Sequence, residues 1–176
     1  CQACGICVSE CPAGVITLRR PEGWKSIDDR LLSFSEASAF ENDRPLIIGF
    51  CCQYGLFGSG ILAGLWESVR GNIRIVPCLC ASSVEAEQIV EAFRLGADGV
   101  FIAGCGDQCA RKDTSIWVRR HTEKVQNTLK QLGRAPERLA YFALGEEPSD
   151  LALELDQFVA RIGMLYLDTV LQEEVR

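Results

Sequence analysis

The sequence predicts an α/β domain in which helices flank a parallel sheet. From Pro45 onward, short buried apolar runs alternate with amphipathic segments, a pattern typical of strand–helix–strand units. Apolar residues make up 48% of the 176 residues, which is enough to fill the core of one domain of ordinary size and leave a small appendage. Strands joined through helices pair in parallel with right-handed crossovers. The expected layers are those of a flavodoxin-like or Rossmann-like fold.

The individual elements follow from periodicity and from stop signals. Short apolar runs predict four strands, at residues 46–50, 73–76, 99–103 and 139–143. Helices are expected near 58–69, from Ala86 to Gly96, over 115–132 and after Pro148. The second of these helices is expected to start at a capping box formed by Ser82 and Glu85. Gly133 is expected to close the third.

Four cysteines at short spacings open the chain. Cys1, Cys4, Cys7 and Cys11 are followed by Pro12, and C-x2-C-x2-C-x3-C-P is the bacterial-ferredoxin signature for [4Fe-4S] ligation. A structural zinc site would instead use two C-x2-4-C pairs separated by a longer loop. The spacing therefore predicts an iron-sulfur motif that forms part of a ferredoxin-like module.

The fourth cysteine of such a run ligates the other cluster in two-cluster ferredoxins. We therefore expect Cys1, Cys4 and Cys7 to bind one [4Fe-4S] cluster and Cys11 to serve a neighbouring one. The chain contains no second C-x2-C-x2-C run and begins without an initiator Met. The expectation is an upstream motif in a longer protein. The alternative is that Cys11 closes a lone cluster.

The chain is expected to consist of a partial ferredoxin-type module, a connector, an iron-sulfur α/β domain and a C-terminal tail, at residues 1–18, 19–44, 45–165 and 166–176. The module is expected to end in a short closing strand over 15–18. Within the connector, Ser26 is expected to cap a helix that carries Leu31, Leu32 and Phe34 on one side.

The six remaining cysteines follow the first three predicted strands in pairs: Cys51 and Cys52, Cys78 and Cys80, Cys105 and Cys109. The carboxyl ends of parallel strands meet at one edge of a sheet, where binding sites form. Cysteine is among the most buried residue types, so burial alone would explain any one of them. Burial does not explain why all six fall in three consecutive loops at one edge. We expect a shared metal site there.

The expected ligands of this second site are Cys52, Cys80, Cys105 and Cys109, with Cys51 as first reserve and Cys78 as second. Adjacent residues at a strand end point to opposite sides, so Cys51 and Cys52 are not expected to bind one iron in the same way. A [2Fe-2S] cluster is preferred because the neighbouring motif is already of the iron-sulfur type. Zinc is the alternative.

Composition excludes several classes of function. The net charge is −6 and the pI is about 4.9. Binding to nucleic acid requires a basic surface, so nucleic acid is not an expected partner. The apolar runs fall short of the roughly 20 residues that span a bilayer. Ten cysteines without a signal peptide favour a reducing compartment, the cytoplasm. No catalytic triad, carboxylate pair or P-loop is evident, so no catalytic residue is expected.

Two further features receive a structural interpretation. Residues 58–63 fit G-x-G-x-x-A after a strand, but the next strand ends in thiols and not in the acidic residue that would bind a ribose. A dinucleotide site is therefore not expected. His121 is the only histidine and lies among charged residues, so it is expected at the surface.

Four segments carry a family resemblance: Gly49–Cys52, Arg74–Cys80, Glu91–Val100 and Phe101–Cys109. Together they resemble the delta subunit of methyl-viologen-reducing hydrogenase, over about residues 45–165. The N-terminal motif resembles the last ferredoxin cluster of the heterodisulfide reductase A protein. Residues 50–57 are similar to fusions of the two, such as the B protein of the quinone-interacting membrane-bound oxidoreductase.

The resemblance implies a [2Fe-2S] cluster that relays electrons between a partner oxidoreductase and the ferredoxin clusters. Those clusters would pass them to FAD in the upstream part. The implied partners are hydrogenase, heterodisulfide reductase or quinone-linked subunits, and any membrane association would be peripheral and through them. The family pattern C-C-x-x-C is broken by Gly55, the usual C-x4-C pair becomes Cys105-x3-Cys109, and Cys78 is an addition.

A zinc-stabilised protein-interaction module without redox activity is the alternative from a different class. In either case the edge that carries the cysteines is expected to lie near a docking surface. Tyr54, Leu56 and Phe57 are the candidate apolar contacts, because aromatic residues are enriched at interface cores. Packing beneath the following glycine-rich segment is the other interpretation of these three side chains.

Overall fold

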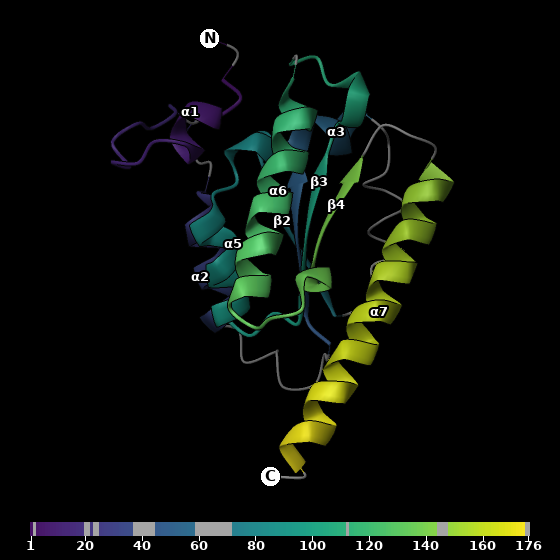
Figure 1. Ribbon diagram of the computed structural model, residues 1–176. Helices are drawn as coiled ribbons and strands as arrows, with labels where there is room; N and C mark the ends of the chain where they lie inside the picture. Colours follow the sequence, from purple (N-terminus) through teal and green to yellow (C-terminus); the bar gives the residue numbers. More distant parts are fainter. Residues whose placement is uncertain are drawn as a thin grey trace.

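The computed structural model describes residues 1, 3–19, 22, 25–36, 45–58, 72–111, 113–143 and 148–174. Within these residues four parallel strands form one sheet in the order β2-β1-β3-β4 (Figure 1). The strands are β1 Ile47–Cys52, β2 Ile73–Cys78, β3 Gly99–Gly104 and β4 Leu139–Ala143. The expected fold class, a parallel α/β sheet with flanking helices, is confirmed.

Four of the described α-helices lie close to their expected positions: α2 Ile27–Glu36, α5 Ala86–Arg94, α6 Thr114–Gln131 and α7 Pro148–Glu174. The short helices α1 Ile6–Ser9 and α3 Gln53–Gly58 have no counterpart among the expected helices. Three 3-10 turns accompany them: η2 Ala81–Ser83, η3 Gly106–Gln108 and η4 Pro136–Arg138. The helix expected near 58–69 lies outside the described residues beyond Gly58. Helix α7 continues past residue 165 without a break.

The two central strands are buried on both faces, and helices cover each face. Every residue of β1 and β3 is buried, as expected for central strands of a parallel sheet. Successive strand residues point to opposite faces. In β4, Tyr141 lies under Arg119 of α6, whereas the Phe142 ring packs 5.7 Å from Phe158 of α7. Helices α6 and α7 therefore cover opposite faces of the sheet.

The connector contains a helix that is packed on the α/β domain. Ser26 caps α2 as expected, because its hydroxyl accepts a hydrogen bond from the Asp29 amide at 2.9 Å. Leu31 is buried, but the expectation for Leu32 is wrong, since it is 53% exposed. The side chain of Phe34 lies outside the described residues. A ten-residue helix buries one stripe, and Leu32 is on its outer side.

Three other expectations are corrected by the structure. Residues 14–19 are irregular and not a strand, since a strand needs a hydrogen-bonding neighbour and no described segment supplies one there. The cap of α5 is Glu85, whose amide donates to Gln88 Oε1 at 3.1 Å, whereas Ser82 lies in η2. His121 is buried and stacks on Trp117 with ring centroids 4.6 Å apart, because it lies on the inner side of α6.

Candidate functional site

Four of the six later cysteines surround one small cavity at the carboxyl end of the sheet. Cys52 ends β1, Cys80 follows β2, and Cys105 and Cys109 flank the η3 turn after β3. The cavity measures about 10 Å³, and all four cysteines line it together with Thr114 and Tyr141 of α6 and β4. The topology thus brings together the four residues that the sequence favoured as ligands.

The sulfur atoms in this cavity are in contact. The Sγ atoms of Cys52 and Cys105 are 3.4 Å apart. Two thiolates bound to one tetrahedral metal at about 2.3 Å lie about 3.8 Å apart, so this pair needs only a small displacement to share a metal. The Cys109 sulfur lies 3.0 Å from the Thr114 hydroxyl, which itself donates to the carbonyl of Arg111 at 2.8 Å.

Mutual contact also shifts the acidities of these thiols. Hydrogen bonding with Cys105 raises the pKa of Cys52 and lowers that of Cys105. The pKa of Cys80 is raised, first by its contact with Cys52 and then by burial. Thiols that share protons in this way become ligands when a metal supplies positive charge. The donor set therefore fits a soft, thiolate-binding metal group such as an iron-sulfur cluster.

The two reserve cysteines lie elsewhere. Cys51 is fully buried at the end of β1, and burial raises its pKa. Cys78 is also buried, and burial is the first cause of its raised pKa. Cys78 lines a separate cavity of about 370 Å³ between the N-terminal segment and the sheet domain, with Val8, Leu18 and Ile27. Neither reserve lines the cavity of the four thiols.

In the N-terminal motif, Cys1 and Cys7 are exposed, while Cys4 and Cys11 are half-buried. The backbone amides of residues 13–16, with Val15 foremost, face the Cys11 sulfur and lower its pKa. Such amide contacts are typical of cluster sulfurs and favour the thiolate. Gly5 takes the left-handed conformation at the start of α1, with φ of 89°. Gly5 thereby turns the chain tightly between Cys4 and Cys7.

Within the described residues, no group of three or more His, Cys, Asp or Glu side chains is arranged to hold a single metal ion. The four thiols of the sheet edge form a continuous series of contacts instead, because Cys52 touches both Cys80 and Cys105, and Cys105 also touches Cys109. A [2Fe-2S] cluster takes its thiolates in two pairs, one pair on each iron.

A cation lies at the edge of the thiol cavity. The guanidinium of Arg111 stacks 4.5 Å from the centre of the Tyr54 ring, and its charge interacts with Cys80 and Cys52. Tyr54 is 57% exposed at the start of α3, while the side chains of Leu56 and Phe57 lie outside the described residues. No local sequence pattern marks Arg111, because only the fold brings it beside these thiols.

The fold and these thiols define a class of protein: a parallel α/β domain with a cysteine site at the carboxyl edge of its sheet. The family of the delta subunit of methyl-viologen-reducing hydrogenase matches residues 47–165. The chain belongs to this family, as the resemblance indicated. None of the described helices combines the length and apolar character needed to cross a bilayer.

Relatives of two kinds are similar to the chain. The A protein of the ferredoxin/F420H2-dependent CoB-CoM heterodisulfide reductase of Methanosarcina acetivorans is 31% identical over 140 residues, which are 76% of this chain and 18% of the relative. The iron-sulfur D protein of the F420-non-reducing hydrogenase of Archaeoglobus profundus is 33% identical over 71% of this chain and 93% of its own length.

The vhc iron-sulfur D protein of the F420-non-reducing hydrogenase of Methanococcus voltae is 36% identical over 57% of this chain and 72% of its own length. The relatives are thus subunits of redox enzymes. The match to the heterodisulfide reductase A protein spans less than a fifth of that protein, whereas the matches to the hydrogenase subunits span most of theirs.

Proposed function

We propose that this chain is the electron-transfer segment of a heterodisulfide-reductase-A-like flavoprotein. It relays electrons between a partner oxidoreductase and a ferredoxin-type cluster through a [2Fe-2S] site at Cys52, Cys80, Cys105 and Cys109. The observation that carries this proposal is the single cavity that all four thiols line. The relatives named as iron-sulfur subunits support the type of cofactor. Binding of the cluster includes a local rearrangement of the four thiols into two pairs, one pair for each iron.

The proposal also includes the N-terminal motif and the part of the protein upstream of it. Cys1, Cys4 and Cys7 bind one [4Fe-4S] cluster, and Cys11 ligates a neighbouring cluster in an upstream segment. FAD belongs to that upstream segment. Hydrogenase, heterodisulfide reductase or quinone-linked subunits are the partners, as the names of the relatives suggest. The setting is the cytoplasm, where thiols remain reduced and available to metals.

The type of metal tests the proposal directly. Anaerobically purified protein is analysed for iron, acid-labile sulfide and zinc, with visible and electron paramagnetic resonance (EPR) spectra. The proposal expects iron with sulfide, charge-transfer absorption in the visible range and a reduced [2Fe-2S] signal. Colourless protein with stoichiometric zinc after anaerobic reconstitution would instead establish a zinc-stabilised interaction module.

The role of Cys11 is tested by comparing this segment with a longer protein that contains an upstream cysteine motif. Cross-ligation predicts that Cys11→Ser removes a cluster from the longer protein and leaves the one held by Cys1, Cys4 and Cys7. If the segment alone holds a full [4Fe-4S] cluster that Cys11→Ser abolishes, Cys11 closes its own cluster.

A further inference from the structure

A buried serine lies between the N-terminal motif and the thiol cavity. Ser82 is fully buried in η2, the turn that follows Cys80. Its hydroxyl donates a hydrogen bond to the backbone carbonyl of Cys4 at 2.8 Å. The same oxygen lies 3.2 Å from the Sγ atom of Cys80. One atom of one side chain therefore contacts a candidate ligand of each site.

The backbone of Ser82 is also part of this contact. Its carbonyl accepts a hydrogen bond from the Ser9 hydroxyl at 3.1 Å, which ties α1 to the turn. The Ser82 amide interacts with the Cys80 sulfur. A buried hydroxyl without partners would cost stability, and here both its donor and acceptor capacities are used. The geometry therefore fixes Ser82 with respect to both segments.

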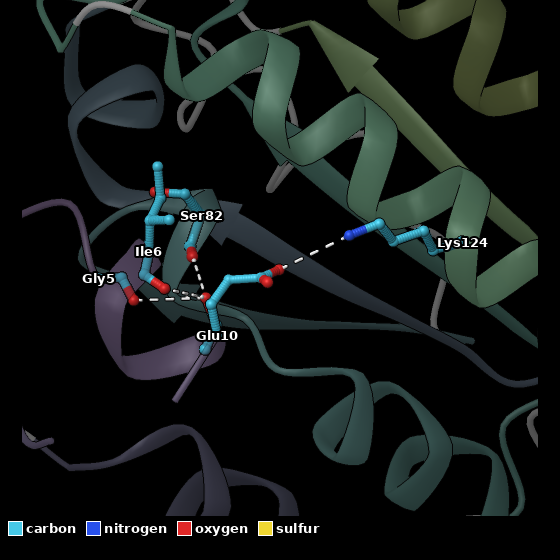
Figure 2. Close-up of polar contacts among 6 residues, drawn as sticks. Gly5, Ile6, Glu10, Ser82 and Lys124 are labelled. Atoms are coloured by element: carbon cyan, nitrogen blue, oxygen red, sulfur yellow. Dashed lines mark hydrogen bonds and ion pairs between the residues drawn. The ribbon is translucent and has the colours of Figure 1, made fainter. Parts of the chain in front are cut away.

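Further contacts hold the N-terminal segment in this place. A Cβ atom on Gly5 would lie 2.9 Å from Ser83 Cα, so the two backbones touch. At the C-terminal end of α1, the Glu10 carboxylate lies 4.0 Å from the Lys124 ammonium group of α6. Figure 2 shows this pair and the contact between α1 and Ser82. Figure 1 shows the segment at the same end of the sheet as α3.

Residues around a metal site influence its chemistry through such contacts. Hydrogen bonds to the sulfurs of an iron-sulfur cluster help to set its reduction potential, and outer partners of the ligands orient them. Ser82 meets both descriptions, because its backbone amide hydrogen-bonds to the Cys80 sulfur and its hydroxyl holds the backbone of Cys4. No other described residue hydrogen-bonds to a cysteine of the N-terminal motif and to one of the four cavity thiols.

We propose that Ser82 is the positioning residue that couples the two iron-sulfur sites. It holds the Cys4 backbone against the Cys80 turn, and the electron route between the sites runs from Cys4 through the Ser82 hydroxyl to the Cys80 sulfur. This inference rests on the proposed function. In each electron transfer, one electron leaves the reduced site and enters the oxidised site, and no covalent bond is formed or broken. A partner oxidoreductase supplies the electron as a one-electron donor.

The test compares Ser82→Ala with Ser83→Ala in the complete protein. Ser83 is a matched control from the same turn, because its hydroxyl donates only to the Cys80 carbonyl, at 2.7 Å. Electron exchange between the sites is followed after rapid photochemical reduction. The EPR spectrum and midpoint potential of the second site are measured in the same samples.

Ser82→Ala is expected to slow the exchange by about tenfold or more, comparable with the loss of activity when an outer partner of a metal ligand is removed. It is also expected to change the spectrum and potential of the second site. Ser83→Ala is expected to stay within about twofold of the unmodified protein. Ser9→Ala provides a second variant, since Ser9 contacts the Ser82 carbonyl at 3.1 Å without touching Cys80. It is expected to slow exchange while leaving the second site's spectrum unchanged.

The possible results separate this inference from the proposed function. If both clusters are present and exchange in Ser82→Ala is within about twofold of the unmodified protein, the coupling role of Ser82 is wrong and the relay stands. If Ser82→Ala does not retain its clusters, Ser9→Ala decides, and an unchanged exchange rate in that variant overturns the inference. If the unmodified protein holds no cluster, the proposed function fails and this inference fails with it.

Discussion

At the scale of single residues, burial and direction divide the six later cysteines into two groups. Cys52, Cys80, Cys105 and Cys109 share a cavity, whereas Cys51 and Cys78 are buried outside it. The alternation of a strand explains the first separation, because Cys51 and Cys52 point to opposite sides of β1. The second follows from the position of Cys78 within β2, with its side chain toward the N-terminal segment. The division leads to a direct test of the ligand set.

We predict that Ser in place of Cys52, Cys80, Cys105 or Cys109 abolishes or strongly alters the reduced [2Fe-2S] EPR signal. Cys51→Ala and Cys78→Ala are the matched controls. They remove fully buried thiols at a cost to the free energy of unfolding of about 1 kcal/mol, and the signal is expected to survive. Loss of the signal in a Cys51 variant but not in Cys52→Ser would reverse the assignment for that loop.

The charge of Arg111 leads to a second prediction at this scale. A nearby cation stabilises the more negative, reduced form of a cluster, so Arg111→Gln is expected to lower the midpoint potential of the second site. One charge at about 10 Å, with an effective dielectric constant of about 20, contributes roughly 1 to 2 kcal/mol. This equals some tens of millivolts for one electron. Arg111→Lys, measured by the same redox titration, is expected to keep most of the potential; an unchanged potential in Arg111→Gln contradicts the prediction.

At the scale of elements, the N-terminal segment is packed against the α/β domain. Helix α1 contacts the η2 turn through Ser9 and Ser82, and α2 is tied to α5 by a hydrogen bond from Gln88 to Asp28 at 3.2 Å. Short helices such as α1 have little stability of their own. The contacts of α1 with the η2 turn must therefore hold the N-terminal motif in its conformation.

Gly5 is the residue on which this docking depends most closely. Gly5→Ala is expected to weaken the docking, because a Cβ atom there meets the backbone of Ser83. Gly14→Ala is the matched control, since Gly14 also has a positive φ, of 62°, but has nothing within 4 Å of its Cβ position. Both variants carry backbone strain of roughly 1 to 2 kcal/mol, so their difference reports the steric contact alone.

Amide hydrogen exchange of residues 6–11 measures this difference. Overpacking typically costs about 1 to 3 kcal/mol, so Gly5→Ala is expected to lose about tenfold more protection than Gly14→Ala. Equal protection in the two variants would show that the segment does not depend on contact with Ser83.

The sequence predicted the elements that depend on local pattern and missed those that depend on tertiary contact. β-branched and aromatic runs located all four strands, and parallel topology then placed the cysteine pairs at one edge. The spacing of Ser82 and Glu85 indicates a capping box, yet the Ser82 hydroxyl donates its hydrogen bond to the carbonyl of Cys4. The charged neighbours of His121 favour a surface position, although α6 places its side chain in the interior. Such partners are distant in sequence, so no local pattern indicates them.

At the scale of the whole molecule, the site and the N-terminal motif occupy the same end of the sheet. The strands β1 and β3 end in the loops that carry the thiols, and α1 lies against the turn after β2. The opposite end holds the C-terminal ends of α5 and α6 and the η4 turn (Figure 1). A protein that exchanges electrons with a partner would be approached from the end that carries its sites.

This arrangement predicts that Tyr54 contacts the partner oxidoreductase. Tyr54 lies two residues after Cys52 and is 57% exposed, and its ring stacks with the Arg111 guanidinium. Tyr54→Ala is expected to weaken binding to copurifying hydrogenase or heterodisulfide reductase subunits by about tenfold, the loss typical of an aromatic interface anchor. Leu132→Ala is the control, because Leu132 is 69% exposed but lies just after the C-terminal end of α6, at the other end of the sheet. Binding measured by surface plasmon resonance, together with cross-linking of the native complex, checks both variants. Cross-links concentrated near Leu132, or equal affinity of the Tyr54 variant and the unmodified protein, would place the partner at the opposite end and separate it from the thiol site.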